Sequence, residues 1–196
     1  MVQTFFLAGA PAVGKSTTAH ALAAHFQKSI HISVDIIREM VVSGLTLPGN
    51  QWGEELIEQL ALARASATQM AMTYNKAGFV VVIDDFWDSN SQLLEYSLLF
   101  QEQNVHKILL LPSQQAAEER NLKRSNSDDG GMYIADGIRA VYESLKTDVI
   151  NLEQQGWIIA DTTDKNIDAT VEYILAHSYK KEVLYESNSH VKNRRN

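Results

Sequence analysis

One octapeptide constrains this chain more than any other feature. It fits the pattern G-x-x-x-x-G-K-[ST] and reads Gly9-Ala10-Pro11-Ala12-Val13-Gly14-Lys15-Ser16. Glycine lets the backbone curl, so that consecutive N–H groups point at one phosphate cluster. We expect Lys15 to reach the β- and γ-phosphates of a nucleoside triphosphate and Ser16 to bind Mg²⁺. Thr17 follows at the start of a helix, whose positive end adds to the anion site. Residues 9–17 therefore predict a site for a nucleoside triphosphate and Mg²⁺.

Five short apolar runs separate longer helical patterns along the chain. The runs cover residues 2–8, 30–34, 79–83, 106–111 and 157–160. Apolar residues recur at helical spacing in 54–77 and 133–152. A chain that alternates strands and helices forms right-handed parallel crossovers. The pattern predicts an α/β fold of the P-loop NTPase type, with a five-stranded parallel sheet and helices on both faces.

The chain length suits one domain, which we place at residues 1–177 of the 196. Within it, we expect residues 120–135 to form a small lid that bears arginines. Residues 178–196 are polar and are expected to form a flexible tail. Two stretches with turn chemistry, 44–53 and 125–131, are expected to be irregular and able to move.

The composition of the chain favours one cellular location and one class of binding partner. The chain has no cysteine, no apolar run long enough to span a membrane and no secretion signal at its start, which favours a cytoplasmic protein. Its net charge is −7, and residues 1–177 alone carry 12 basic and 22 acidic groups. Such a surface does not attract long nucleic acids. We expect a small-molecule or nucleotide-like partner instead.

Asp35 follows the second apolar run, and Arg38 lies one helical turn later. Ligands of an open parallel sheet sit at the carboxyl ends of its strands, so we expect Asp35 to share a crevice with the phosphates. A carboxylate there can accept the proton of an attacking hydroxyl and orient that hydroxyl. Alternatively, Asp35 caps its helix. Arg38 would hold an anionic part of the acceptor or pair with a surface acid.

Asp84 and Asp85 end the third apolar run. An acid that follows a strand beside the phosphate-binding loop commonly holds Mg²⁺ through water. Both residues are candidates for this metal role, and the alternative is that they cap the next helix.

Arg120 and Arg124 are four residues apart on a predicted helix that follows Pro112, so they share a helix face. Two guanidinium groups ahead of a glycine-bearing loop would clamp the charge that builds on a phosphoryl group in transfer. The alternative is a solvated helix face beside Glu118 and Glu119.

Two other groups of residues are less informative. Asp161-Thr162-Thr163-Asp164 follow the last apolar run, where we expect them to cap a helix at 166–177 rather than to contact the nucleotide base. The six histidines are scattered, with no pair at metal-ligand spacing, and we assign none of them a role.

The chain resembles a group of P-loop kinases, which includes the 5′-hydroxyl polynucleotide kinase of bacteriophage, chloramphenicol phosphotransferase and zeta toxins. The likeness to the polynucleotide kinase module covers most of residues 1–150. It rests on the P-loop with Pro11, on Asp35-x-x-Arg38, on the strand that ends at Asp85, and on Arg120-Asn121-x-Lys123-Arg124 followed by Ile138-Arg139-x-x-Tyr142-x-Ser144-Leu145. The likeness to chloramphenicol phosphotransferase rests on Val34-Asp35, Ile83-Asp84-Asp85 and Asp161-Thr162-Thr163.

This resemblance implies particular roles. Asp35 would be the general base, Arg38 would contact a phosphate of the substrate, and Arg120 and Arg124 would be lid arginines on the phosphate in transfer. The chain has no room for the phosphatase domain of the bifunctional phage enzyme.

The sequence therefore predicts an ATP- and Mg²⁺-dependent phosphotransferase. Its acceptor would be a hydroxyl of a small molecule, a nucleoside or a 5′-hydroxyl nucleic-acid end. The expected catalytic residues are Lys15, Asp35, Arg120 and Arg124. The alternatives are a zeta-toxin-like kinase for nucleotide sugars and a regulatory P-loop ATPase that acts as a switch.

Overall fold

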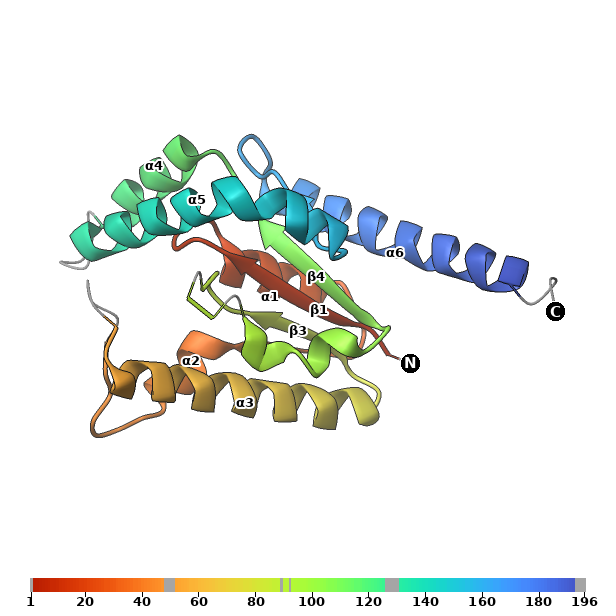
Figure 1. Ribbon diagram of the computed structural model, residues 1–196, viewed down its shortest axis with the longest axis horizontal. Helices are drawn as coiled ribbons and strands as arrows, with labels where there is room; N and C mark the ends of the chain where they lie inside the picture. Colours follow the sequence, from red (N-terminus) through yellow and green to blue (C-terminus); the bar gives the residue numbers. More distant parts are fainter. Residues whose placement is uncertain (1, 48–51, 89, 92, 126–130, 193–196) are drawn as a thin grey trace.

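The five apolar runs form the five strands of one parallel sheet, in the order β2-β3-β1-β4-β5 (Figure 1). Each strand begins and ends within two residues of its predicted run. The strands are β1 (Thr4–Gly9), β2 (Ser29–Ser33), β3 (Val80–Asp84), β4 (Val105–Leu110) and β5 (Ile158–Ala160). The predicted α/β class and parallel sheet are confirmed.

The computed structural model describes residues 2–47, 52–88, 90–91, 93–125 and 131–192. Within these ranges, the side chains of residues 124–125, 131–134 and 180–192 are outside the description. The loop expected at 125–131 falls almost wholly on residues that are not described. Of the other expected irregular stretch, residues 44–47 and 52–53 are described and form neither helix nor strand.

Six α-helices connect and follow the strands in the described part of the chain. They are α1 (Lys15–Ala24), α2 (Val34–Glu39), α3 (Glu54–Lys76), α4 (Gln114–Ser125), α5 (Gly131–Gln154) and α6 (Ile167–Lys192). The helices predicted at 54–77 and 133–152 are confirmed by α3 and α5. Two short 3-10 helices between β3 and β4 were not expected, namely η1 (Leu94–Tyr96) and η2 (Leu99–Gln101).

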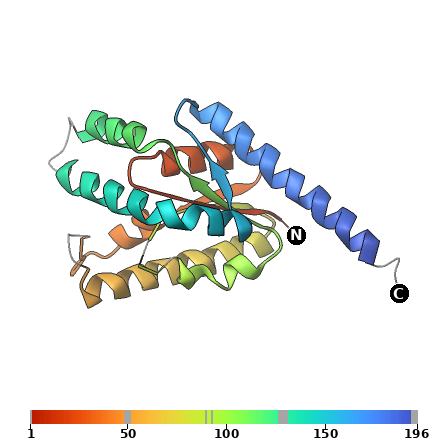
Figure 2. The ribbon, with the colours of Figure 1, turned by 45° about the horizontal axis from the view of Figure 1, so that its top comes forward.

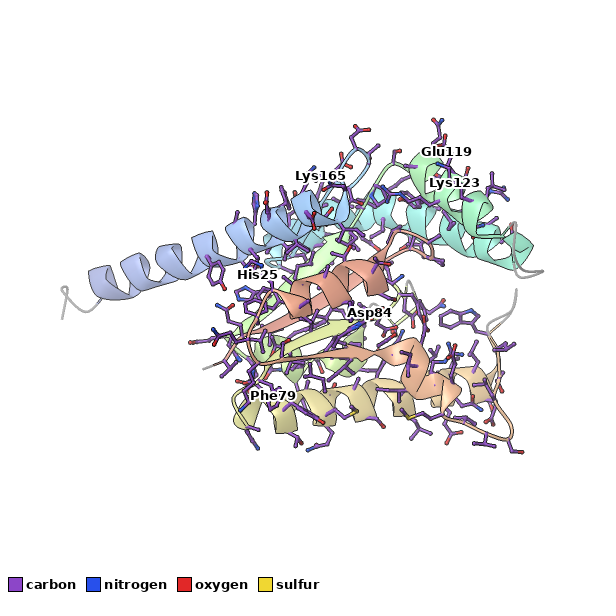
Figure 3. The ribbon with its side chains drawn as sticks, turned by 180° about the vertical axis from the view of Figure 1, so that it is seen from behind. His25, Phe79, Asp84, Glu119, Lys123 and Lys165 are labelled. Atoms are coloured by element: carbon purple, nitrogen blue, oxygen red, sulfur yellow. The ribbon has the colours of Figure 1, made fainter. Side chains whose placement is uncertain are left out.

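The helices cover both faces of the sheet. Helices α1 and α6 pack together on one face, while α3, the two 3-10 helices and α5 cover the other (Figures 1 and 3). Every residue of the central strand β1 is consequently buried. Because the strands are parallel, the carboxyl ends of β1, β2 and β3 lie along one edge of the sheet. Lys15, Asp35 and Asp85 follow these three ends in the chain.

Helix α6 differs from the expectation at its end. It does not stop at residue 177 but continues to Lys192, and its last turns extend away from the sheet (Figure 2). The segment contains neither glycine nor proline, so nothing in it interrupts the helical backbone. Residues 178–192 of the expected tail thus continue α6, and the flexibility of residues 178–196 stays a prediction.

Gly9 ends β1 at a close approach to β4. A Cβ on Gly9 would lie 2.6 Å from the carbonyl oxygen of Leu110 and 3.0 Å from Cγ2 of Val13. The first of these atoms belongs to the backbone and cannot rotate away. The position therefore accepts only glycine without a backbone shift.

We expect Gly9→Ala to lower the free energy of unfolding by about 2 kcal/mol because of this overlap. Urea unfolding measures the change. Gly137→Ala is the control, since its Cβ would meet Pro11 Cγ at 3.6 Å, an ordinary contact inside α5. Gly137→Ala should gain about 0.5–1 kcal/mol. Equal stabilities of the two variants would contradict the close approach at Gly9.

Candidate active site

The phosphate-binding loop lies between β1 and α1, at the carboxyl edge of the sheet. Its curl uses positive φ angles at Ala12 (61°) and Gly14 (94°). Gly14 is the N-cap residue of α1, and its carbonyl accepts the N–H of Thr18 at 2.9 Å. The loop after β3 contacts the phosphate-binding loop, because the backbone N–H of Trp87 donates to the Gly9 carbonyl at 2.9 Å. The backbone of the motif therefore has the expected curled form.

The polar residues of the motif lie at the start of α1. Lys15 is buried, and its Nζ donates to the carbonyl oxygen of Ala10 at 2.9 Å, so the ammonium group lies over its own loop. Ser16 and Thr17 are exposed in the first turn of the helix. The loop thus gathers a cation, two hydroxyls and the positive end of a helix in one place.

Asp84 connects this loop to the end of β3. Ser16 Oγ donates to Asp84 Oδ1 at 2.7 Å, and His31 Nε2 lies 2.6 Å from Asp84 Oδ2. Figure 3 shows Asp84 beside α1. Hydroxyl and carboxylate oxygens are ligands that Mg²⁺ accepts, so Ser16 and Asp84 fit this ion. His31 received no role from the sequence, because a partner 53 residues away leaves no local signal.

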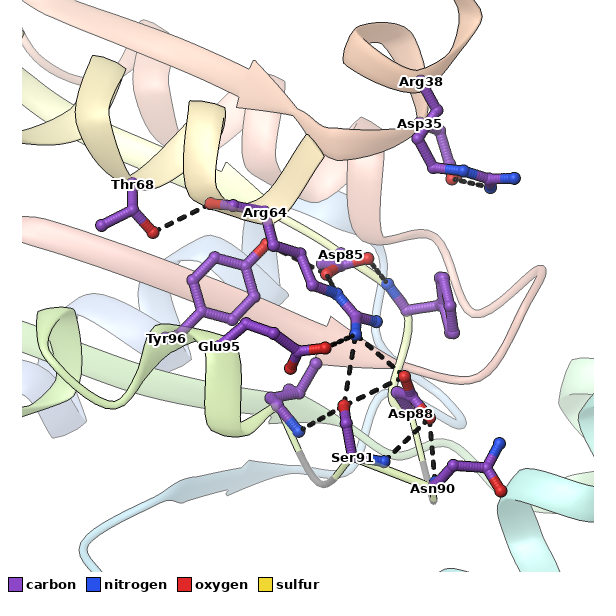
Figure 4. A network of polar contacts seen from close by, with 12 residues as sticks. Asp35, Arg38, Arg64, Thr68, Asp85, Asp88, Asn90, Ser91, Glu95 and Tyr96 are labelled. Carbon is purple, nitrogen blue, oxygen red and sulfur yellow. Dashed lines mark hydrogen bonds and ion pairs between the residues drawn. The ribbon is translucent and has the colours of Figure 1, made fainter. Parts of the chain in front are cut away.

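Asp85 faces the other side of the sheet, since successive side chains of an extended chain point to opposite faces. Its Oδ2 accepts hydrogen bonds from Arg64 Nε at 2.9 Å and Tyr96 OH at 3.0 Å, and its Oδ1 accepts the Phe86 N–H at 2.8 Å (Figure 4). The two neighbouring acids therefore belong to different environments. Asp84 contacts Ser16, and Asp85 contacts α3 and η1.

Arg64 is the centre of this second environment. Its side chain is fully buried, and its Nη1 donates to Asp88 Oδ2 and to Glu95 Oε1, each at 2.8 Å (Figure 4). Together with Asp85, three carboxylates thus surround one guanidinium. The network joins α3 to η1 and to the loop that follows β3.

Sequence reasoning missed Arg64, although a signal was present. Arg64 lies on the apolar face of α3 that includes Leu60, Ala63 and Ala67, all of them buried. A guanidinium on a buried face requires carboxylate partners. The acids that follow β3 were visible as possible partners, but their distance from Arg64 in the chain concealed the pairing.

Burial changes the protonation of this network. Exclusion of water raises the pKa of Asp85 to about 6, although Arg64 and the hydrogen bonds from Arg64 and Tyr96 act in the opposite direction. Burial and the charge of Asp85 raise the pKa of Tyr96 well above its usual value. Burial alone would lower the pKa of Arg64, but the surrounding carboxylates raise it above its usual value.

Asp35 lies in the first turn of α2, with its side chain 59% exposed. The N-cap position belongs to Ser33, so the alternative that Asp35 is the N-cap residue is wrong. Arg38 Nη1 lies 3.7 Å from Asp35 Oδ1, and Arg38 Nη2 donates to the Thr46 carbonyl at 3.1 Å. The charge of Asp35 contributes to the raised pKa of Asp85, because the two acids end neighbouring strands.

Arg120 fixes α4 against the phosphate-binding loop. Its Nη1 donates to the Val13 carbonyl at 3.3 Å, and its Nη2 donates to the carbonyls of Thr162 at 2.7 Å and Thr163 at 3.3 Å. The expectation of a solvated helix face is therefore wrong for Arg120. Arg124 belongs to the same helix, and its side chain is outside the described residues.

The expected cap of α6 is corrected. Asp161 accepts the N–H and the hydroxyl of Thr163 at 2.9 and 2.6 Å, within its own loop. Asn166 is the capping residue, because its Oδ1 accepts the Ala169 N–H at 2.8 Å. The sequence placed the cap several residues too early.

A curled loop of this kind between β1 and α1 of a β2-β3-β1-β4-β5 parallel sheet defines the P-loop NTPase fold. The model of the AAA domain family matches residues 5–145, which is more than half of the chain. The chain belongs to this AAA domain family.

Solved structures with the same fold include several kinases. A gluconokinase from Sinorhizobium meliloti 1021 superimposes with a TM-score of 0.62 at 16% identity, covering 94% of this chain and 97% of that chain. The shikimate kinase of Acinetobacter baumannii in complex with shikimate has a TM-score of 0.58 at 14% identity, and the match covers 96% of this chain and 95% of that chain. The tunicamycin resistance protein of Deinococcus radiodurans has a TM-score of 0.57 at 18% identity, and the match covers 89% of this chain and 94% of that chain. These identities show a shared fold.

No curated protein sequence matches the chain. Among the residues that the structure describes, no helix combines the length and the apolar character needed to cross a membrane.

The raised pKa of Asp85 predicts a pH effect on stability. The folded state holds this proton up to about pH 6, while an unfolded carboxyl releases it near its ordinary value of 3.8. The protonated Asp85 carboxyl therefore adds to the free energy of unfolding at low pH, and this contribution is lost as the pH rises from about 4 to about 6. Over this range, wild type should lose about 1–3 kcal/mol relative to Asp85→Asn.

Denaturant titrations at several pH values measure this difference. Asp136→Asn is the control, because Asp136 is an exposed carboxylate with 57% of its side chain accessible. Its stability profile should run parallel to that of wild type. A parallel profile for Asp85→Asn as well would show that Asp85 titrates normally.

Proposed function

We propose that the protein is an ATP- and Mg²⁺-dependent phosphotransferase that moves the γ-phosphoryl group to a hydroxyl of a small molecule. The observation that carries this proposal is the bond between Ser16 and Asp84, at the same sheet edge as the exposed carboxylate of Asp35. One side of the edge thus offers groups for a metal–nucleotide complex. The other offers a carboxylate that can accept a proton.

The nucleotide is held by the phosphate-binding loop in this proposal. The backbone N–H groups of residues 9–17 and the Lys15 ammonium bind its β- and γ-phosphates. Ser16 and Asp84 would hold Mg²⁺, which would neutralise phosphate charge. His31 keeps the Asp84 carboxylate in position through its other oxygen. Asp85 has no metal role here, because it binds Arg64 instead.

Asp35 acts on the acceptor. Its carboxylate accepts the proton of the attacking hydroxyl and orients the oxygen towards the γ-phosphorus. Arg38 positions Asp35 and contributes to substrate binding. Arg120, which already lies on the P-loop, and Arg124 would stabilise the charge of the phosphoryl group in transfer.

A small acceptor is favoured by two observations. The names of two structural neighbours refer to small hydroxyl compounds, gluconate and shikimate. The acidic surface of the chain disfavours long nucleic acids. A 5′-hydroxyl nucleic-acid end and a nucleotide sugar remain acceptors to include in the screen below.

The experiment that tests this function is a screen of hydroxyl compounds with ATP labelled at the γ-phosphate, read as label on the product. Steady release of phosphate to water alone, stimulated by a protein and without any labelled alcohol, would instead indicate a regulatory ATPase.

Asp35→Asn should lower kcat by about 10²- to 10⁴-fold and leave ATP binding nearly intact, because it removes a general base. Steady-state kinetics and calorimetry measure the two effects. Glu39→Gln is a matched control, since Glu39 is an exposed acid on the same helix, α2. Full turnover by Asp35→Asn would exclude the general-base role.

Asp84→Asn and Asp85→Asn should separate the two neighbouring acids. Asp84→Asn should raise the Mg²⁺ concentration needed for binding of a non-hydrolysable ATP analogue by about 10- to 100-fold. Asp85→Asn should leave this concentration unchanged, because Asp85 faces α3. Isothermal titration calorimetry at several Mg²⁺ concentrations provides the comparison. The reverse order of effects would move the metal role to Asp85.

A further inference from the structure

The part of the chain that includes the acceptor side of the proposed site carries most of its net negative charge. We call residues 34–101, from the start of α2 to the end of η2, the acceptor segment. It contains nine acidic and three basic side chains, whereas the rest of the chain carries 15 acidic and 14 basic ones. The phosphate-binding loop and the predicted lid both lie outside this segment. Asp84 contacts Ser16 on the nucleotide side, and the other eight acids leave the rest of the segment with an excess of negative charge.

The cations of the acceptor segment are already engaged. Arg38 is 7% exposed and contacts Asp35 and the Thr46 carbonyl. Arg64 is fully buried among three carboxylates. Lys76 ends α3 just before β3 begins, so it lies at the opposite edge of the sheet.

Four carboxylates contact the two guanidinium groups of Arg38 and Arg64. Asp35, Asp85, Asp88 and Glu95 face Arg38 and Arg64, as Figure 4 shows in one view. An added carboxylate or phosphate would meet net repulsion here, and its strength grows as water is excluded. A neutral or positively charged group would not.

Two aromatic rings lie next to these charges. Phe86 directly follows Asp85, and Trp52 lies just before α3. Their rings meet edge to face, with centroids 5.9 Å apart, and both side chains are only partly buried. The Phe86 ring also lies 5.2 Å from the Arg64 guanidinium carbon. Such a pair offers apolar surface for the ring of a ligand, and aromatic ring faces attract positive charge.

Two buried guanidinium donors in the acceptor segment, one of them next to Phe86, point to the same kind of ligand. Arg64 Nη2 and Arg38 Nε have no hydrogen-bond partner among the described residues, and both side chains are more than nine-tenths buried. Buried N–H groups favour an oxygen acceptor. A hydroxyl, ether or carbonyl oxygen provides this without adding negative charge.

We propose that the acceptor is a ring-containing alcohol without an acidic group, uncharged or positively charged, whose ring lies against Trp52 and Phe86. This inference rests on the proposed phosphotransferase function. It selects against sugar acids, hydroxy acids and phosphorylated acceptors.

The charge around Trp52 is tested without any acceptor, by quenching of tryptophan fluorescence. Trp87 and Trp157 are buried at 2% and 6% exposure, so the difference between wild type and Trp52→Phe isolates Trp52. The quenching constant of this difference signal is measured for each ion and divided by that of uncharged acrylamide. The ratio for caesium should be at least about twofold higher than the ratio for iodide, because the negative charge around Trp52 attracts cations. Stronger quenching by iodide would overturn the proposal.

The acceptor class is tested with matched compounds and γ-labelled ATP. Glucose, glucosamine and glucuronate share a pyranose ring, and adenosine and adenosine 3′-monophosphate share a 5′-hydroxyl. The acidic member of each set should have a kcat/KM about 10- to 100-fold below that of its best partner. Labelled products confined to the acidic members would refute the acceptor class and leave the phosphotransferase function standing. No labelled product in any set, with ATP bound, would overturn both.

The ring contact is tested by Trp52→Ala. This variant should raise the KM of the best acceptor about tenfold, because it removes aromatic contact area, and should leave ATP binding unchanged. Leu47→Ala is the matched control, since Leu47 precedes the same helix and is 73% exposed. Equal KM values for the two variants would remove Trp52 from the acceptor contact.

Discussion

The alternation of side chains at the end of β3 is the constraint on which the site depends. Two adjacent carboxylates leave the strand on opposite faces, so that one meets Ser16 and the other meets Arg64. A shift of one residue in the pairing of β3 would exchange them. The parallel pairing of β3 with both β1 and β2 fixes this register. The register of the sheet thereby assigns each acid its environment.

The buried ion network around Arg64 is better explained by position than by stability. Burying charges costs solvation energy, and apolar replacements of such networks are often at least as stable. Here the network holds the loop after β3 through Asp85 and Asp88. That loop also carries the Trp87 N–H that binds the Gly9 carbonyl. A contact on α3 is therefore connected, through one short loop, to the backbone of the phosphate-binding loop.

The fold followed closely from the sequence, whereas the site followed only in part. Apolar runs and helical spacing are local signals, and they located all five strands and the long helices α3 and α5. The phosphate-binding loop is local in the same way. The partners of Asp84 and Asp85 come from β2, α1, α3 and η1, and no local pattern encodes such distances. His31 and Arg64 were missed for this reason.

The contacts of Arg120 limit how α4 can move against the phosphate-binding loop. One guanidinium joins carbonyl oxygens of the phosphate-binding loop and of the loop after β5. The middle of α4 is therefore anchored to two connections that begin at strands of the sheet. A movement of α4 away from these two loops must break the four hydrogen bonds that Arg120 donates to Val13, Thr162 and Thr163. Three of the four acceptors are main-chain oxygens, which side-chain substitution leaves in place, so the anchor depends on the single guanidinium of Arg120.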